Sequence, residues 1–481
     1  MSPKLFGLKL IVGIFMLLWN GYLIPVHSEN PMYPSSMASG TIPIIHITTE
    51  AERPIEDKET AIPALFYIEQ KESAYEVVGS KESPISLTIK GRGNYTWEQP
   101  KKPYKLKFDS KISLFGLPKS KHYALMAHIV NSGHVWADNE AGFELARKIG
   151  MSWAPHTVPV ELIINDEYMG VYFLSETVRI EENRVNIFEQ EDEETDPEII
   201  PYGWLVEIDN HWDDNQLRFY EYDDRWIVFT FHSPEVLSHI QWDYIEFEMK
   251  EINEAIHDSD DPDRWTNYID AESLAQYFIV REILHDPDAY SGSFYMTKDK
   301  EDKAKWKVGP IWDCTSQTDM KDSYITHWKY SEGDQNLSWM PTLMRSPAFE
   351  KAVKEVWRNF YSEENINAVI AHVRQYAEDL DEAFAANNER WKELHPNQHY
   401  QRKEQLGYIE RALKNNAQWI DSHLNINEIC ENFNTAVEEI TLPENPEKTY
   451  FTIEGIRLKG EPNSPGLYIL RMGNKSRVVL K

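Results

Sequence analysis

Asp313 is the first side chain in this sequence that could do chemistry. It follows the run KWKVGPIW, which we expect to be a buried strand, and it precedes the polar loop CTSQTD. An aspartate that leaves a strand near a second aspartate can hold Mg²⁺ against phosphate oxygens. The same residue could be an ordinary turn residue at the end of the strand. Thr315, two positions further on, supplies no second carboxylate.

A second candidate lies in REILHDPDAYSGSFYM, residues 281–296. This stretch follows a predicted buried helix and precedes a predicted strand, as a catalytic loop would. Asp288 would accept the proton of a substrate hydroxyl or orient that hydroxyl, and Asp286 is the alternative base. Because Asp-Pro-Asp is also common turn chemistry, the sequence leaves both interpretations open.

The third candidate is the turn GRGN, residues 91–94, between two predicted strands. Gly91 and Gly93, with Arg92 between them, would let the backbone approach a phosphate closely. A turn of this kind between strands is usually only a hairpin turn. The next segment of the chain strengthens the phosphate interpretation.

The segment after this turn, PKKPYKLKF, is rich in lysine. Its apolar residues alternate with Lys105 and Lys107, which predicts a strand that buries one face and turns both lysines away from it. A lysine on the strand after a glycine-rich turn is how protein kinases reach the nucleotide phosphates. Lys101 and Lys102 precede the alternating part. The alternative is that these lysines merely line the solvent face of an edge strand.

The elements that must position these residues change in kind along the chain. Residues 43–108 predict several strands, and residues 158–178 predict a hairpin that turns at Asn165-Asp166. Residues 138–151 predict a helix, with Asp138 as N-cap and Gly150 as its end. From residue 242 the pattern is mainly helical. The expected fold class is α+β, with a β-rich N-terminal lobe and a helical C-terminal lobe, the outline of a bilobal kinase.

Composition narrows the class of partner. The chain has 481 residues and a formal net charge of −30, which argues against nucleic acid or anionic lipid as partners. It has only 2 cysteines, so it is not a disulfide scaffold. We favour two buried thiols, although a bridge between Cys314 and Cys430 stays open at this point.

The first residues predict export from the cytoplasm. Lys4 and Lys9 precede an apolar core at 10–19, and Val26-His27-Ser28 is a plausible cleavage site. We therefore expect residues 1–28 to be a signal peptide, and a secreted, periplasmic or surface location. The alternative is an N-terminal membrane anchor, but Asn20 and Pro25 interrupt the apolar run early. No other stretch is apolar enough to span a membrane.

Five motifs in order resemble one known family. The motifs IKGRGNYTW, PKKPYKLKF, NDEYMGVYFLSE, HDPDAYSGSFYM and GPIWDCT are similar to those of the spore coat protein H (CotH) kinase-like family, over residues 43–425. The resemblance implies an atypical bilobal protein-kinase-like fold that binds ATP with Mg²⁺. It also implies transfer of phosphate to Ser residues of a secreted or surface protein.

The resemblance assigns roles by position. The GRGN turn would cover phosphate, Lys105 or Lys107 would contact it, and Glu144 would pair with that lysine. Asp288 would be the catalytic aspartate. These further residues complete the assignment: Glu176 within the adenine-side hinge 175–177, Asp313 as the metal ligand, and Ser293 at the second metal position.

Two departures from the family pattern weaken the expected metal site. The family usually shows Trp-Asp-x-Asp, where this chain has Thr315, and it usually shows Asn where this chain has Ser293. Both hydroxyls could bind a cation, but neither carries charge. The first hypothesis is therefore an ATP- and Mg²⁺-dependent kinase for Ser or Thr with a partly degenerate metal site. The second is a catalytically impaired surface or structural binding protein, and aromatic richness suggests a third, a glycan-associated surface protein.

The last segment, 440–481, predicts short strands. Its end, GLYILRMGNKSRVVLK, resembles the terminal β-module that can act as a sorting signal on secreted bacterial proteins. The alternative is a small hairpin that packs on the main domain.

Overall fold

The structure is a computed structural model, and its described residues form two compact units that divide between Asn427 and Glu428. The predicted signal peptide, residues 1–28, and Cys430 lie outside the described residues. These are 33–70, 78–128, 136–209, 216–221, 225–300, 304–317, 324, 339–393, 401–428, 448–452, 458, 467–472 and 475–480.

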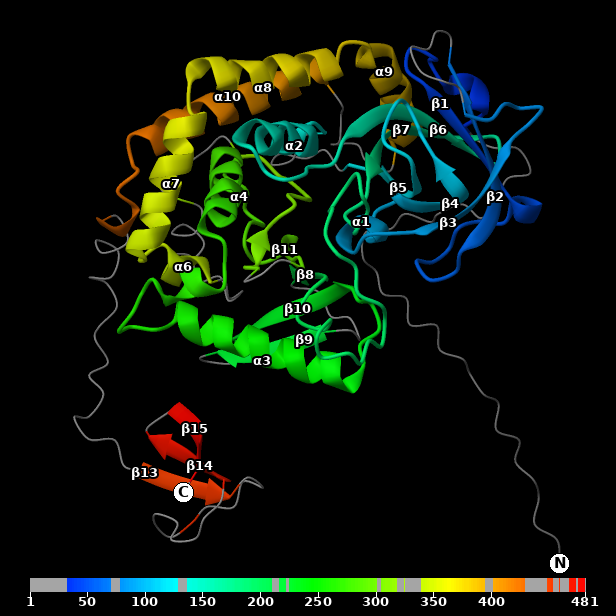
Figure 1. Ribbon diagram of the computed structural model, residues 1–481. Helices are drawn as coiled ribbons and strands as arrows, with labels where there is room; N and C mark the ends of the chain where they lie inside the picture. Colours follow the sequence, from blue (N-terminus) through cyan, green and yellow to red (C-terminus); the bar gives the residue numbers. More distant parts are fainter. Residues whose placement is uncertain are drawn as a thin grey trace, which may run out of the picture. The chain divides into compact units, whose positions relative to one another are not determined.

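A closed seven-stranded barrel forms the first part of the larger unit (Figure 1). The strand order is β1-β2-β3-β4-β5-β7-β6, and a parallel pairing of β1 with β6 closes it. The bounds are β1 Ile44–Thr49, β2 Ile62–Glu69, β3 Ile85–Gly91, β4 Tyr104–Ile112, β5 Ser120–Met126, β6 Thr157–Ile164 and β7 Glu167–Glu176.

The barrel interior is packed with side chains from alternate positions of its strands. On β4, Leu106 and Phe108 are buried in this core, while Lys105 and Lys107 are exposed. The predicted alternation is therefore confirmed. The predicted hairpin turn between β6 and β7 is also confirmed, with Asn165 and Asp166 at positive φ (51° and 61°), as a two-residue turn of this kind requires.

A second sheet follows the barrel, in the order β12-β11-β8-β10-β9. Strands β8, β9 and β10 precede residue 242, where the helical pattern was expected to begin, but β11 and β12 follow it and join the same sheet, so the division into strands first and helices later was too simple. The predicted strand before Asp313 is also shorter than expected, since β12 ends at Val308. The bounds are β8 Trp204–Ile208, β9 Gln216–Glu221, β10 Arg225–Ser233, β11 Phe294–Lys298 and β12 Lys307–Val308.

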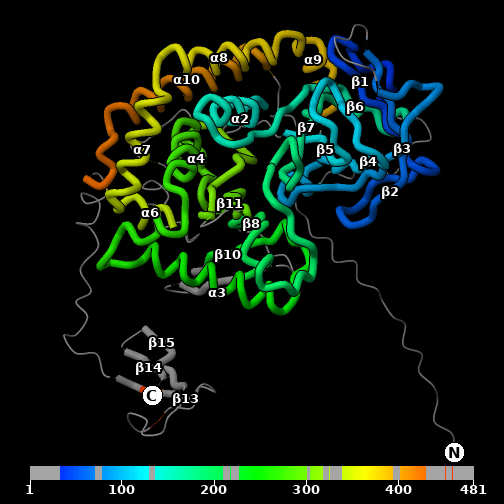
Figure 2. Tube along the Cα trace, viewed as in Figure 1, coloured from blue at the N-terminus to red at the C-terminus, as the bar shows by residue number. Residues whose placement is uncertain are grey.

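Helices complete the larger unit, and α4 lies at their centre. From Leu274 to Leu284 every residue of α4 is buried, because α2, α7 and α10 all pack against it (Figures 1 and 2). The bounds are α1 Tyr95–Glu98, α2 Asp138–Ile149, α3 His239–Ile256, α4 Ala271–Leu284, α6 Met340–Leu343, α7 Pro347–Phe360, α8 Glu363–Tyr376, α9 Leu380–Trp391 and α10 Arg402–Asp421; short 3-10 turns span Ser35–Met37, Glu50–Glu52 and Arg264–Asn267.

Helix α2 begins and ends close to the predicted positions. Gly150 follows its last residue in the left-handed conformation (φ 93°), which confirms the predicted end. Asp138, however, is the first helical residue rather than the N-cap, and its carboxylate accepts a hydrogen bond from the Ser316 hydroxyl. The side chain expected to cap the helix therefore joins α2 to the segment that follows Asp313.

Helix α9 attaches the helices to the barrel. The Asn387 Oδ1 atom accepts from the backbone N–H of Val171 on β7 (3.0 Å) and from Lys101 Nζ (2.8 Å). Lys101 also donates to the Val171 carbonyl and is buried. The lysine cluster of the sequence therefore divides: Lys101 fastens α9 to β7, whereas Lys105 and Lys107 face solvent.

The smaller unit is a three-stranded antiparallel sheet in the order β13-β14-β15. The strands are β13 Lys448–Thr452, β14 Leu467–Met472 and β15 Lys475–Leu480. Each strand pairs with its neighbour in sequence, so the sheet is an antiparallel meander.

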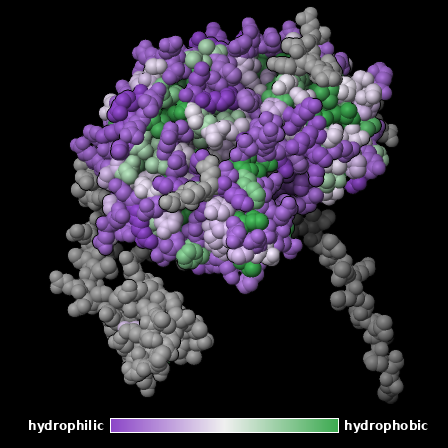
Figure 3. Space-filling view, viewed as in Figure 1, coloured by the Kyte–Doolittle hydropathy of each residue, from purple (hydrophilic) through white to green (hydrophobic). Residues whose placement is uncertain are grey.

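The larger unit confirms the α+β class. In the part of the chain that the structure describes, we find no helix long and apolar enough to cross a membrane. The visible face of the described residues is mostly hydrophilic, with small scattered apolar patches (Figure 3). This surface agrees with the strongly acidic composition.

Candidate active site

Arg281, near the end of α4, is the centre of the candidate site. Its side chain is fully buried, and its guanidinium pairs with the Asp286 carboxylate. The same guanidinium donates to the carbonyls of Trp312 (2.7 Å) and Asp313 (3.0 Å), and more weakly to that of Ser293 (3.4 Å). One side chain therefore joins the two stretches that sequence analysis had singled out separately.

The two aspartates of the Asp-Pro-Asp motif have different environments. Asp286 is fully buried and accepts backbone N–H groups from Asp288 (3.0 Å) and Thr315 (3.2 Å). Burial raises the pKa of Asp286, and the Arg281 charge opposes that rise. Asp288 is exposed. The structure therefore favours Asp288 over the alternative base Asp286, because the Asp286 oxygens are buried and already bonded, while Asp288 is exposed.

The backbone of the same two segments is held in an uncommon conformation. Four non-glycine residues have positive φ: His285 (52°), Tyr290 (71°), Ser293 (49°) and Asp313 (53°). Such residues cost free energy and persist only where surrounding contacts determine the backbone. Arg281 supplies part of this determination, because it bonds the carbonyls of Ser293 and Asp313 directly. Clustered strain of this kind is typical of functional sites.

Asp313 itself is exposed, but it has dense protein around it. Burial by the surrounding protein raises the pKa of Asp313. The positive charges of Arg92 and Arg281 oppose this rise, whereas the negative charge of Asp288 adds to it. Because the side chain keeps contact with solvent, the shift is smaller than full burial would give. The two carboxylates, Asp288 and Asp313, thus belong to one electrostatic neighbourhood.

Arg92 brings the GRGN turn to Asp313. Its guanidinium carbon lies 5.6 Å from the centre of the Trp312 ring, and its charge acts on Asp313. Gly91, in contrast, is buried beneath the Trp97 ring, and a Cβ there would overlap that ring. Gly93 has φ +83° and lies against Thr96. Local packing thus explains why glycine occupies positions 91 and 93. Arg92 is the residue of this turn that reaches the candidate site.

The segment after Asp313 is fastened to the first turns of α2. Asn139 Oδ1 accepts the backbone N–H of Cys314 (2.8 Å), and Asp138 accepts from Ser316. Cys314 is a free, buried thiol, as expected. Gly142 lies directly against it, because a Cβ on Gly142 would overlap Cys314 Sγ and lie 2.9 Å from its Cβ. Asp313 therefore projects from a segment that is held on both sides.

The five-stranded sheet contributes a further carboxylate, Glu207, to the surroundings of Arg92. Glu207 on β8 accepts from His232 Nε2 on β10 (2.6 Å) and lies opposite Tyr295 of β11. Burial alone would lower the pKa of His232, but the bond and charge of Glu207 outweigh it and raise the pKa. Glu207 also acts electrostatically on Arg92. Sequence reasoning missed this group, because β8 reads as a simple buried strand.

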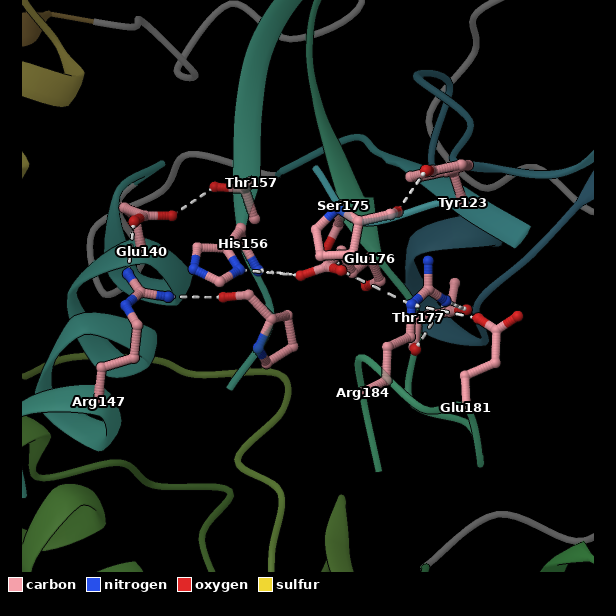
Figure 4. A network of polar contacts seen from close by, with 12 residues as sticks. Tyr123, Glu140, Arg147, His156, Thr157, Ser175, Glu176, Thr177, Glu181 and Arg184 are labelled. Carbon is pink, nitrogen blue, oxygen red and sulfur yellow. Dashed lines mark hydrogen bonds and ion pairs between the residues drawn. The ribbon is translucent and has the colours of Figure 1, made fainter. Parts of the chain in front are cut away.

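Glu176, predicted to belong to the adenine-side hinge, lies at the end of β7. Its carboxylate accepts from His156 Nδ1 (2.9 Å) and the His156 backbone N–H (3.1 Å), and lies 3.7 Å from Arg184 Nε (Figure 4). The side chain is fully buried. The Glu176 carboxylate is therefore engaged by His156 and Arg184, and the role of residues 175–177 as an adenine-side hinge stays a prediction.

Glu144 has a different partner from the predicted one. Its carboxylate accepts from Arg147 Nε on the same helix (2.8 Å), three residues further on. The pairing with Lys105 or Lys107 is therefore wrong in this structure. Glu140, a buried acid of the same helix, accepts from Arg147 (3.0 Å), from Thr157 on β6 (2.6 Å) and from His372 on α8 (2.7 Å).

The two positions that depart from the family pattern have distinct surroundings. Ser293 is half-buried directly before β11. Thr315 is buried, and its backbone N–H bonds Asp286. A pocket between α8 and α10 contains none of the predicted site residues.

Comparison with models of protein families shows to which family this chain belongs. The family model described as CotH kinase protein matches residues 89–425. This chain belongs to the CotH kinase family. No curated protein matches the chain. The matched range begins within β3, yet β1 and β2 complete the same barrel, so the CotH-family fold of this chain starts before the matched range.

The CotH-family chain has the donor types that Mg²⁺ prefers. Carboxylates at Asp288 and Asp313 and the Ser293 hydroxyl are hard oxygen donors. Among the residues described by the structure, no three His, Cys, Asp or Glu side chains gather closely enough to hold a metal alone. The donor set therefore fits a Mg²⁺ ion that also takes oxygens from phosphate and water, as Mg²⁺ commonly does.

Proposed function

We propose that this CotH-family protein is an ATP- and Mg²⁺-dependent kinase that phosphorylates Ser or Thr of a secreted or surface protein. The observation that carries the proposal is the neighbourhood of Asp313. Arg92 reaches it from the GRGN turn, Asp288 acts on it electrostatically, and Arg281 bonds its backbone. A cation from the turn and two open carboxylates are the groups that a kinase needs around a phosphate.

Each residue has a specific role in this proposal. Asp288, exposed on the loop after α4, accepts the proton of the substrate hydroxyl. Asp313 and Ser293 would hold Mg²⁺, which would supply positive charge near the transferring phosphate. Lys105 and Lys107, exposed on β4, contact nucleotide phosphate. Arg281 is a positioning residue, because it touches the loops and not the substrate.

The proposed arrangement is bilobal. The barrel would form one lobe, and the five-stranded sheet with its helices the other. The effect of Lys105 on His232 supports this, since a charge on the outer face of the barrel acts on the sheet. A nucleotide between the two would meet lysines on one side and carboxylates on the other. Export through residues 1–28 would place the acceptor protein outside the cytoplasm.

Calorimetry with ATP, with and without Mg²⁺, tests the proposal. We expect Mg²⁺-dependent ATP binding that Asp313→Ala abolishes while the fold remains intact. The double variant Lys105→Ala/Lys107→Ala should weaken ATP binding both with and without Mg²⁺, because the lysines contact phosphate directly. Lys250→Ala, an exposed lysine on α3, is the matched control. ATP binding that survives Asp313→Ala unchanged would refute the metal-site assignment.

A catalytically impaired binding protein is the second candidate function, and the environment of Thr315 favours it. Thr315 is buried beside Asp286, where the family usually has a carboxylate. Thr315→Asp should lower the melting temperature without metal, because it places a second carboxylate near Asp286. It should also tighten Mg²⁺-ATP roughly tenfold, about 1.4 kcal/mol. Thr315→Asn is the matched control without charge.

The result separates the two functions. If Thr315→Asp tightens Mg²⁺-ATP and the parent already transfers phosphate, the parent is an active kinase with a weakened site. If only the variant transfers phosphate, the parent is a binding protein. If neither binds Mg²⁺-ATP better than Thr315→Asn does, the metal interpretation fails.

A further inference from the structure

The outer face of β4 and β5 carries a group of basic side chains. Lys107 on β4 lies in register with His122 on β5, and Lys105 lies two residues along the same strand. Their neighbours Leu106 and Tyr123 fill the barrel interior. Because side chains alternate across a strand, Lys105, Lys107 and His122 all project from the outside of the barrel.

Arg179, which follows β7, completes this group. Burial lowers the pKa of His122, and the charges of Arg179, Lys105 and Lys107 lower it further, to about 3. Glu181 opposes this effect, but only as the smallest of these contributions. The imidazole is therefore neutral at physiological pH, although it lies among three cations.

The Glu181 carboxylate is already engaged elsewhere. It accepts from the Ser120 hydroxyl (2.7 Å), and it lies 3.3 Å from Lys111 Nζ and 3.6 Å from Arg184 Nε. In the described part of the chain, no ion pair is formed by Lys105, Lys107 or Arg179. Three carboxylates do act on this group electrostatically, Glu181 and Glu189 on Arg179 and Glu235 on Lys105, so its positive charge is only partly compensated in a chain of net charge −30.

Two polar atoms of this group lack a partner inside the described structure. His122 Nδ1 and Arg179 Nε are both buried from solvent, and neither makes a hydrogen bond. Buried polar groups are nearly always bonded, since leaving one unpaired costs free energy. Mutual repulsion of the cations adds to that cost. Both would be relieved by an anion with several acceptor oxygens.

We propose that His122, Lys107 and Arg179 form an oxyanion subsite for a phosphate group, adjacent to Lys105. Phosphate offers several strong acceptor oxygens and close to two negative charges at neutral pH, which match two cations and the imidazole. Its binding would favour protonation of His122 by a proton from solvent. The subsite deepens the proposed function, and it rests on that function only for the assumption that Lys105 and Lys107 face a phosphorylated ligand.

The subsite lies toward the end of the barrel where β5 meets the end of β7. Tyr123, next to His122, pairs with Glu176. Arg92 and Asp313 lie toward the opposite end of β4, since Tyr104, the first residue of β4, pairs with Gly91. A phosphate held beside His122 therefore lies toward the other end of β4 from Arg92, and Lys105, on which Arg92 acts electrostatically, lies between them. This difference in position along β4 allows the two sites to be tested independently.

Pyrophosphate binding by the full chain in EDTA, measured by calorimetry, tests the subsite without metal or nucleotide base. We expect binding that Arg179→Gln and Lys107→Gln each weaken roughly tenfold, as for the loss of one charge-assisted hydrogen bond. Lys250→Gln, with the same change of charge on α3, should bind as the parent does. In NMR, pyrophosphate should raise the pKa of His122 from about 3.

The outcomes distinguish the subsite from the proposed function. Asp313→Ala should keep pyrophosphate binding in EDTA while it loses Mg²⁺-ATP, so each assignment can fail alone. Displacement of pyrophosphate by ATP would identify a nucleotide as the source of the phosphate, and displacement by O-phosphoserine a phosphorylated protein. No pyrophosphate binding, equal binding by all the variants, or an unchanged His122 titration would overturn the subsite.

Discussion

The acidic side of the site and the basic outer face of the barrel are built in opposite ways. Around Arg281, nearly every polar group has a partner, and the backbone at Ser293 and Asp313 is held at positive φ. On β4 and β5, Lys105 and Lys107 project into solvent, and the strand alone sets their direction. The carboxylate side is thus fixed by contacts between distant segments, whereas the direction of the two lysines follows from the alternation of a single strand.

The largest test of this contrast removes the scaffold. Arg281→Met should lower the free energy of unfolding by about 3–5 kcal/mol, because it leaves the buried Asp286 carboxylate without its partner. Denaturant unfolding measures this. The double variant Arg281→Met/Asp286→Asn should recover part of the loss, since no buried charge then remains. A loss below about 1 kcal/mol in the single variant would mean that Arg281 does not organise the acidic side.

A test of intermediate size concerns the contact between α2 and the segment after Asp313. Gly142→Ala should destabilise by about 1–3 kcal/mol, because the new methyl overlaps Cys314. Helix propensity alone predicts the opposite sign, a gain of up to about 1 kcal/mol. Gly407→Ala on α10 is the matched control, since its Cβ would meet only Arg411 at 3.5 Å and should stabilise.

The double variant Gly142→Ala/Cys314→Ala refines this prediction. Cys314→Ala removes the overlap with Sγ but keeps the close contact with the Cβ of residue 314, so Gly142→Ala should cost less stability in the Cys314→Ala background than in the parent. If Gly142→Ala alone were stabilising, the close contact between α2 and Cys314 would not hold. Chemical denaturation of the four proteins gives the comparison.

The smallest test is on the basic face and uses pH. The pKa of His122 is lowered from 6.5 to about 3 by burial and the neighbouring cations. Between these values the unfolded chain binds a proton that the folded protein does not, so stability is full above pH 6.5 and falls as pH decreases. The slope is at most about 1.4 kcal/mol per pH unit, less after solvent screening.

His122→Gln should remove this contribution. The melting temperature of the parent should therefore fall more between about pH 7.5 and about pH 5 than that of the variant. His239→Gln, an exposed histidine on α3, is the control and should behave as the parent does. Identical pH profiles for parent and His122→Gln would show that burial and the neighbouring cations do not lower the pKa of His122.

Features that depend on local spacing could be predicted from the sequence. The alternation of apolar residues with Lys105 and Lys107 predicted the exposed face of β4, and the spacing of Asn165-Asp166 predicted the hairpin. Asp270 caps α4 as an aspartate before a helix commonly does, by accepting the Ser273 N–H (2.8 Å). The family motifs also appear in order along the chain. In each case the residues that set the structure are close in sequence.

Which polar residues work together depends on the tertiary structure. Asp286 and Asp288 look alike in the sequence, yet one is buried against Arg281 and the other is exposed. Glu144 was expected to meet a lysine, but Arg147 on its own helix is nearer. Closure of the barrel between β1 and β6, and the meeting of Glu207 with His232, join residues far apart in the chain. Partners of that kind depend on packing between elements, which no local pattern encodes.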